Sequence, residues 1–211
     1  MGKTLVFQGD SITDCGRATC GGAGYPMYDL GPGYAGIIAS KLLAESPEKN
    51  WNIINRGISG DRCVDLYARW KKDCVNFKPD ILSILLGIND IGHEINHCNG
   101  VDAKRFDQFY RMLLDWARDV NPQLELIIME PFAFNFGFVN DSWLPELKIR
   151  QEIVKKIAAD YSAAFIPLQS IFDAALTKAP QEHWMVDGIH PTNAGHGLIV
   201  KAWLEAAGDL I

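Results

Sequence analysis

Three side chains in this sequence have the types and the spacing that acyl transfer requires. Ser11 follows closely on Thr4–Gln8, a short apolar stretch that predicts a buried strand. Asp187 and His190 are three residues apart, so one turn can bring the carboxylate to Nδ1 of the imidazole. Nε2 then remains free to take a proton from a serine hydroxyl. The spacing therefore predicts a nucleophile, a general base and a group that orients the base.

Donors for an oxyanion hole are also available. Acyl transfer passes through a negatively charged oxygen, which backbone N–H groups and amide side chains stabilise. We expect these donors to be the backbone N–H groups of Ser11 and Gly60 and the side-chain amide of Asn89. The alternative for Asn89 is that it only ends the strand before it. This arrangement needs no metal ion and no cofactor.

The rest of the chain alternates between predicted strands and predicted helices. Apolar runs predict five strands, at residues 4–8, 52–55, 81–86, 124–129 and 164–166. Periodic apolar positions predict helices at 34–44, from 61 onward, and at 102–120, 144–161, 170–178 and 193–207, with a long loop at 14–33. We therefore expect one α/β domain over residues 1–211, with three α/β/α layers around a central, mostly parallel five-stranded sheet. The order of the strands stays open.

Three further residues are candidates for substrate binding, each with a structural alternative. Asp10 is better suited to holding backbone donors in the turn before Ser11. Phe132 begins an alternating series that is either a strand or hairpin edge with one buried face or an aromatic wall beside the site; its members are Phe132, Phe134, Phe136 and Phe138. Trp184 is either a core residue or a lid over the acyl pocket.

The remaining histidines and the cysteines do not indicate a metal site. His93 and His97 could share a helical face, but no third ligand follows at a matching spacing, so we expect exposed side chains. His196 is expected to pack or cap in the first turn of the last helix. None of the five cysteines forms a C-x-x-C pair, which leaves zinc binding and thioredoxin-like chemistry unsupported.

The charge balance restricts the class of partner. The chain has 20 basic and 26 acidic residues and a net charge of -6, without a basic stripe. We therefore expect no nucleic-acid partner and no binding to an anionic membrane. No apolar run approaches the ~18 residues of a membrane span, and the chain begins directly with a strand, so we expect a cytoplasmic protein. The expected partner is a small-molecule ester, and a homo-oligomer stays open.

Four sequence blocks carry the candidate residues, and together they resemble the SGNH (GDSL) hydrolase superfamily. In chain order the blocks are Gly9-Asp-Ser-Ile-Thr13, Asn55-Arg-Gly-Ile-Ser-Gly60, Gly87-Ile-Asn-Asp90 and Asp187-Gly-Ile-His-Pro191. The resemblance implies a flavodoxin-like fold and a serine esterase with Ser11, Asp187 and His190 as its triad. The Gly-x-Ser-x-Gly elbow of α/β-hydrolases is absent, because Thr13 occupies the place of its second glycine.

More narrowly, the stretches 9–17, 57–60, 66–70 and 191–196 look like the bacterial acetylxylan-esterase branch. This resemblance implies removal of acetyl groups from sugars such as acetylated xylo-oligosaccharides. That branch has a tryptophan soon after Gly-x-Asn-Asp, whereas Ile91-Gly92-His93 stands here, which leaves the shape of the pocket open. The alternatives are a lysophospholipase or thioesterase, and a catalytically silent carbohydrate-binding relative.

Overall fold

A parallel sheet of five strands forms the centre of the computed structural model, which describes residues 2–18 and 26–211. The strands are β1 (Thr4–Gly9), β2 (Asn52–Asn55), β3 (Ile81–Leu85), β4 (Glu125–Met129) and β5 (Ala164–Ile166). Their order in the sheet is β2-β1-β3-β4-β5, and every pair is parallel. The chain leaves β1 toward one edge of the sheet and leaves β3 toward the other. This divergence opens a crevice at the carboxyl ends of the two strands, where ligands bind in such sheets.

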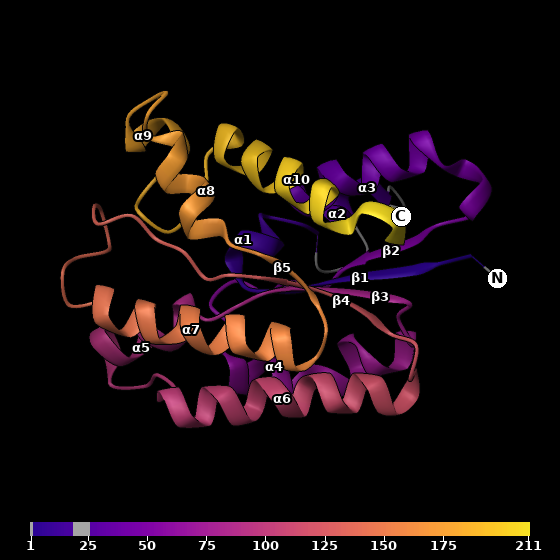
Figure 1. Ribbon diagram of the computed structural model, residues 1–211, viewed down its shortest axis with the longest axis horizontal. Coiled ribbons are helices and arrows are strands. Elements are labelled where there is room, and N and C mark those ends of the chain that lie inside the picture. Colours follow the sequence, from indigo (N-terminus) through magenta and orange to yellow (C-terminus); the bar gives the residue numbers. More distant parts are fainter. Residues whose placement is uncertain (1, 19–25) are drawn as a thin grey trace.

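Helices cover both faces of the sheet, which confirms the predicted three-layer α/β class (Figure 1). One face carries α3 (Tyr34–Glu45), α8 (Leu168–Ala175) and α10 (Asn193–Ala207), and the other carries α4 (Cys63–Asp73), α6 (Ala103–Val120) and α7 (Leu144–Asp160). Alternate residues of β1 enter two separate cores, with Leu5 and Phe7 in one and Val6 in the other. All of β3 is buried, as expected for a strand that is covered on both faces.

Short helices complete the chain, and several were not predicted. These are α1 (Ser11–Asp14), α2 (Pro26–Leu30), α5 (Ile88–His97), α9 (Gln181–Trp184) and the 3-10 turns Pro47–Lys49, Val75–Phe77 and Gly208–Leu210. Ser11 therefore begins a helix, and the expected loop over 14–33 contains one. The helix predicted at 170–178 begins and ends earlier, as α8.

The buried face of α7 differs from the sequence pattern. Ile149, predicted on that face, is 43% exposed, whereas its neighbour Arg150 is buried. The guanidinium of Arg150 donates to the carbonyl of Val101 (2.6 Å) and lies over the ring of Phe106. Because Arg150 is buried with these partners, the face of α7 that packs against the protein is shifted by one residue from the predicted face. A pattern of apolar residues alone does not indicate a buried arginine.

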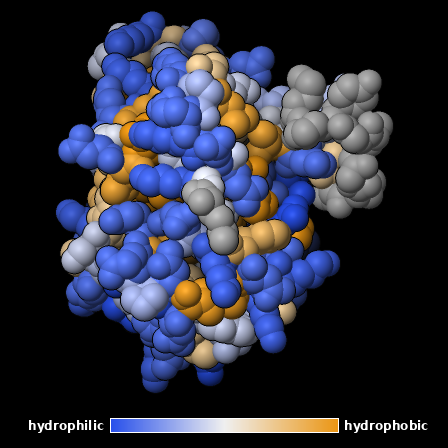
Figure 2. All heavy atoms as spheres, turned by 90° about the vertical axis from the view of Figure 1, so that its right-hand side faces the viewer, coloured by the Kyte–Doolittle hydropathy of each residue, from blue (hydrophilic) through white to orange (hydrophobic). Residues whose placement is uncertain are grey.

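The carboxyl and amino ends of the strands lie on opposite sides of the molecule. In Figure 1 the strands run from right to left, toward α1, and Ile211 lies at the right. Figure 2 shows the right-hand face, on which hydrophilic side chains predominate and apolar ones form small separate areas. In the described part of the chain, no helix is both long and apolar enough to cross a membrane.

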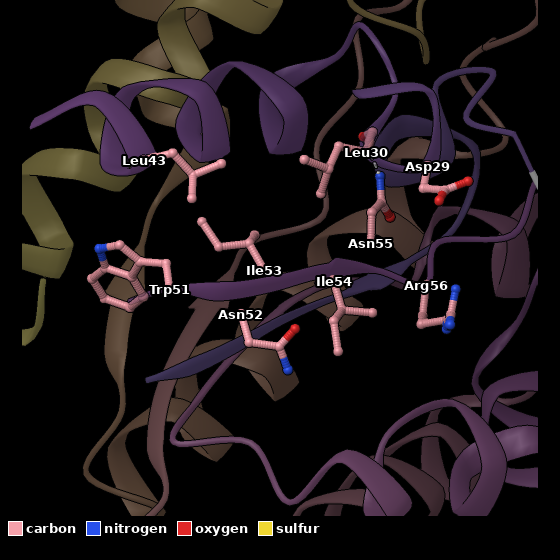
Figure 3. Close-up of a pocket in the computed structure, with 9 residues that line it drawn as sticks. All are labelled: Asp29, Leu30, Leu43, Trp51, Asn52, Ile53, Ile54, Asn55 and Arg56. Atoms are coloured by element: carbon pink, nitrogen blue, oxygen red, sulfur yellow. Dashed lines mark hydrogen bonds between the residues drawn. The ribbon is translucent and has the colours of Figure 1, made fainter. Parts of the chain in front are cut away.

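A groove of about 360 Å³ runs along the free edge of β2 (Figure 3). Its walls are formed by Asp29, Leu30, Leu43, Trp51, Asn52, Ile53, Ile54, Asn55 and Arg56. At its inner end the side-chain amide of Asn55 donates to the carbonyls of Thr13 and Leu30. The groove is thus separate from the residues that the sequence predicts to carry chemistry, although Asn55 connects its wall to α1.

Candidate active site

Ser11 occupies the first position of α1, directly beyond the carboxyl end of β1. The carboxylate of Asp10 accepts the backbone N–H of Ile12 (3.0 Å) and caps this helix. Gly9 permits the sharp exit from the strand, since its φ is 155° and an added Cβ would lie 2.3 Å from the carbonyl oxygen of Leu85. The serine hydroxyl is therefore presented at the crevice between β1 and β3.

The hydroxyl of Ser11 contacts the imidazole of His190, with 2.8 Å between Oγ and Nε2. On the other side of the ring, Nδ1 lies 2.7 Å from Oδ2 of Asp187. Burial alone would raise the pKa of Asp187, but hydrogen bonds from His190 and Ile189 outweigh it and lower that pKa. The group is therefore a carboxylate that accepts, Nδ1 carries the proton, and Nε2 accepts from the serine.

The structure also brings Gly60 and Asn89 close together. Asn89 is the second residue of α5, and its amide donates to the carbonyl of Asp61 (3.2 Å), next to Gly60. This bond uses one of the two amide hydrogens. At Gly60 φ is 85°, and no described atom outside the neighbouring residues lies within 4 Å of the place a Cβ would take. The space in front of the Gly60 backbone is therefore open to a ligand.

Hydrogen bonds hold the segment that carries Gly60 against the ends of α1. The N–H of Ser59 donates to the carboxylate of Asp14 (3.0 Å), and the N–H of Ile58 donates to the carbonyl of Gly9 (3.1 Å). Arg17 adds a donor from its Nε to the carbonyl before Ile58 (2.8 Å). These contacts fix the two segments relative to each other. Neither Asp14 nor Arg17 was among the site residues predicted from the sequence.

This constellation can be compared with known proteins. A model of the GDSL-like lipase/acylhydrolase family matches residues 7–198. The chain is 33% identical over 209 residues to an acetylxylan esterase of Geobacillus stearothermophilus, covering 98% of this chain and 94% of the relative. The chain belongs to the GDSL-like lipase/acylhydrolase family. It is a carboxylic ester hydrolase, and the resemblance of its four sequence blocks is confirmed.

Solved structures of the family share the fold along the whole length of this acylhydrolase. A protein of Parabacteroides merdae described as a GDSL-like lipase has a TM-score of 0.93 at 36% identity, covering 98% of this chain and 95% of that one. The Geobacillus acetylxylan esterase has a TM-score of 0.84 at 30% identity, covering 98% and 94%. Two further structures of that enzyme are described as catalytic mutants, one with a serine and one with an aspartate changed to alanine.

Two buried carboxylates support the helices of this acylhydrolase that carry Ser11 and Asn89. Asp10 caps α1, and Asp90 accepts the backbone N–H of Cys63 (3.0 Å), where α4 begins. Burial raises the pKa of each carboxyl group to about 7. Asp10 is 1% exposed and lies beneath the site, so the structure corrects its assignment to substrate binding and agrees with the expected turn-holding role.

The two aromatic candidates are core residues. Phe132 is 1% exposed and stacks on Phe172, with 4.3 Å between ring centroids. Trp184 is buried, and its Nε1 donates to the carbonyl of Ala179 (3.2 Å). Residues 132–138 form no strand, which excludes the strand alternative for this series. Both rings belong to the core on the α8 and α10 side of the sheet.

An indole does lie beside α5, although it comes from another part of the chain. Trp143, at the start of α7, packs against Gly92, where an added Cβ would lie 2.5 Å from Cη2 of the indole. Gly92 belongs to Ile91-Gly92-His93, the segment that follows Asn89-Asp90. A larger side chain at position 92 would therefore collide with Trp143, a contact between distant segments that no local sequence pattern indicates.

The expectation of exposed side chains on α5 holds for His97, whereas His93 is only partly exposed. His196 is buried in the first turn of α10, where its Nδ1 accepts the backbone N–H of Tyr34 (3.2 Å), which confirms a packing role. Among the residues that the structure describes, no group of three or more His, Cys, Asp or Glu side chains could hold a metal ion.

Proposed function

We propose that this acylhydrolase is a serine esterase that removes acetyl groups from carbohydrates through an acyl-enzyme. The observation that supports the proposal is the unbroken series of contacts from Ser11 Oγ through the imidazole of His190 to the carboxylate of Asp187. Each contact has the length of a hydrogen bond and the polarity that a nucleophile, its base and the orienting acid require.

In the first half of the reaction, Oγ of Ser11 attacks the ester carbonyl while Nε2 of His190 takes the hydroxyl proton. Asp187 holds the ring and stabilises the imidazolium. The oxyanion is bound by the backbone N–H groups of Ser11 and Gly60 and by the second amide hydrogen of Asn89. The C–O bond to the alcohol then breaks, and His190 gives its proton to the leaving oxygen.

In the second half, water replaces the alcohol. His190 takes a proton from the water as its oxygen attacks the acyl-serine, and the same donors bind the second oxyanion. The bond to Oγ breaks, the proton returns to Ser11, and acetic acid is released, which then loses its own proton to solvent. Every proton that moves within the site is thus taken up and returned by one imidazole, so the cycle consumes only ester and water.

The acetyl and sugar parts of the proposal rest on the acetylxylan esterase relative. A series of 4-nitrophenyl esters from acetate to dodecanoate tests the acyl group, and we expect kcat/KM to be largest for acetate. A maximum at eight carbons or more would instead favour the lysophospholipase or thioesterase alternative. A fluorophosphonate probe should label Ser11, as identified by peptide mapping, and labelling of another residue would contradict the mechanism.

A further inference from the structure

Two exposed apolar side chains flank Asp187. Among the described residues, Phe138 and Val186 are the most exposed large apolar side chains, at 67% and 66%. Val186 directly precedes Asp187, and the backbone N–H of Phe138 donates to the carbonyl of Asp187 (3.0 Å). Scattered single apolar side chains are ordinary on a protein surface. These two differ from such scattered residues in their position next to Asp187.

The segment that carries Phe138 is packed tightly against the turn that contains Asp187. An added Cβ at Gly137 would lie 2.5 Å from the carbonyl oxygen of Asp187, and one at Gly188 would lie 2.3 Å from the carbonyl oxygen of Phe136. Both glycines have positive φ, 64° and 88°, which residues with side chains rarely adopt. These close contacts hold the backbone of Phe138 in place relative to Asp187. The backbone of this segment therefore loses little conformational entropy when a ligand binds.

The chemistry of the site determines which part of a substrate lies near this segment. The leaving alcohol must approach His190, because Nε2 returns a proton to its oxygen. The carbonyl oxygen points the other way, toward Gly60 and Asn89, which follow β2 and β3. The remainder of the alcohol then extends over the turn that joins Asp187 to His190, and Phe138 is bonded to that turn.

We infer that Phe138, together with Val186, the neighbour of Asp187 in the chain, binds the sugar ring on the alcohol side of the ester, an inference that rests on the proposed function. A pyranose ring presents C–H groups on its faces, and the negative face of a benzene ring attracts them. A phenylalanine side chain has no hydrogen-bonding group. It therefore favours an alcohol that presents a C–H face of a sugar ring over a small alcohol by stacking alone. Contacts of this kind change affinity by roughly 3- to 10-fold.

The test compares two acetyl esters in the same purified protein. One is an O-acetylated xylo-oligosaccharide and the other is ethyl acetate, whose alcohol has no ring to stack on Phe138. We expect Phe138→Ala to lower the ratio of their kcat/KM values by roughly 3- to 10-fold, mainly through a higher KM for the sugar ester. Phe138→Tyr keeps the ring and should restore the ratio. Met112→Ala, which truncates an exposed apolar side chain on α6, should leave it unchanged.

The other outcomes separate the inference from the function on which it rests. A wild-type protein without preference for the sugar ester would overturn both. A wild-type preference that persists in Phe138→Ala would overturn the inference alone. Equal losses on both esters would make Phe138 a structural residue, and a smaller sedimentation coefficient for Phe138→Ala would assign it to contact between copies of the chain. Either result would also overturn the inference.

Discussion

His190 and His196 lie six residues apart, yet their surroundings give them opposite tautomers. Nδ1 of His190 faces the carboxylate of Asp187 and must carry the proton, so Nε2 accepts from Ser11. Nδ1 of His196 accepts the backbone N–H of Tyr34 and carries no proton. In a neutral ring the hydrogen then lies on Nε2, which is 3.4 Å from the sulfur of Cys15. The partner of Nδ1 thus decides whether the other nitrogen can act as a base.

The two rings also differ in solvent access. The side chain of His190 is 39% exposed, whereas His196 is only 4% exposed. Burial, with a smaller contribution from the charge of His190, lowers the pKa of His196 to about 4. His196 therefore stays neutral at physiological pH and serves as a packed hydrogen-bonding group. A general base needs the opposite conditions, which are an acceptor toward the substrate and a carboxylate behind the ring.

Removing the proposed nucleophile, Ser11, is the strongest test that His190 acts as a general base. Ser11→Ala should lower kcat for an aryl acetate by on the order of 10⁵–10⁶-fold, because the covalent step is lost while the fold remains. Steady-state kinetics measure this, with circular dichroism to verify folding. The matched control is Ser170→Ala, at an exposed serine on α8, which should keep full turnover. Retention of a tenth of the activity in Ser11→Ala would exclude the triad mechanism.

Asp187→Asn should convert His190 to the tautomer of His196. An amide nitrogen beside Nδ1 donates where the carboxylate accepted, so the ring hydrogen moves to Nε2 and the base is lost. We expect kcat to fall by about 10⁴-fold. The control Asp209→Asn, at an exposed position near the C-terminus, should show wild-type kinetics. If Asp187→Asn kept wild-type kcat, the partner of Nδ1 would not decide the role of the ring.

Asn89→Ala tests the proposed oxyanion donor, whose amide donates to the carbonyl of Asp61. Losing one oxyanion donor should lower kcat by ~10²–10³-fold, roughly 3–4 kcal/mol of transition-state stabilisation, with little change in KM. Asn89→Asp should be at least as harmful, because a carboxylate repels the oxyanion. Asn96→Ala, at an exposed position on the same helix, is the control. A change confined to KM would remove Asn89 from the oxyanion hole.

The features predicted correctly from the sequence are those that local geometry determines. Asp187 and His190 share one turn, so their spacing already implies the contact that the structure shows. The strand residues 52–55 and 164–166 were predicted to the residue, because short apolar runs between turn formers leave little choice. The missed helix α5 also had a local signal, since Ile88, Ile91 and Ile95 follow a spacing of three and four.

The features that were not predicted depend on contacts between distant segments. Phe132 is buried because α8 presents Phe172 to it, and Gly92 is covered because Trp143 arrives from the start of α7. The close approach of Gly137 to Asp187 joins residues fifty positions apart. The order of the strands in the sheet likewise depends on contacts between distant segments. No periodicity or composition within one segment reports which other segment will cover it.

His196→Gln tests the second region and should have the smallest effect on catalysis. Glutamine keeps one acceptor and one donor but does not titrate, so turnover at pH 7.5 should stay within several-fold of wild type. The difference lies in stability. Between pH 6.5 and about 4 the unfolded chain protonates this histidine and the folded chain does not, so the wild-type free energy of unfolding falls as the pH falls, by about 3 kcal/mol in total.

Urea denaturation at pH 7.5 and at pH 4 measures this contribution as a difference between the two proteins. The buried carboxylates Asp10 and Asp90, whose pKa values are raised, give a slope of opposite sign, but both proteins contain them and the slope cancels in the comparison. His97→Gln, at an exposed histidine on α5, should follow the wild-type curve. Equal pH dependence in wild type and His196→Gln would show that His196 is protonated in the folded state. A folded but inactive His196→Gln would place this ring in the mechanism, and the contrast with His190 would no longer hold.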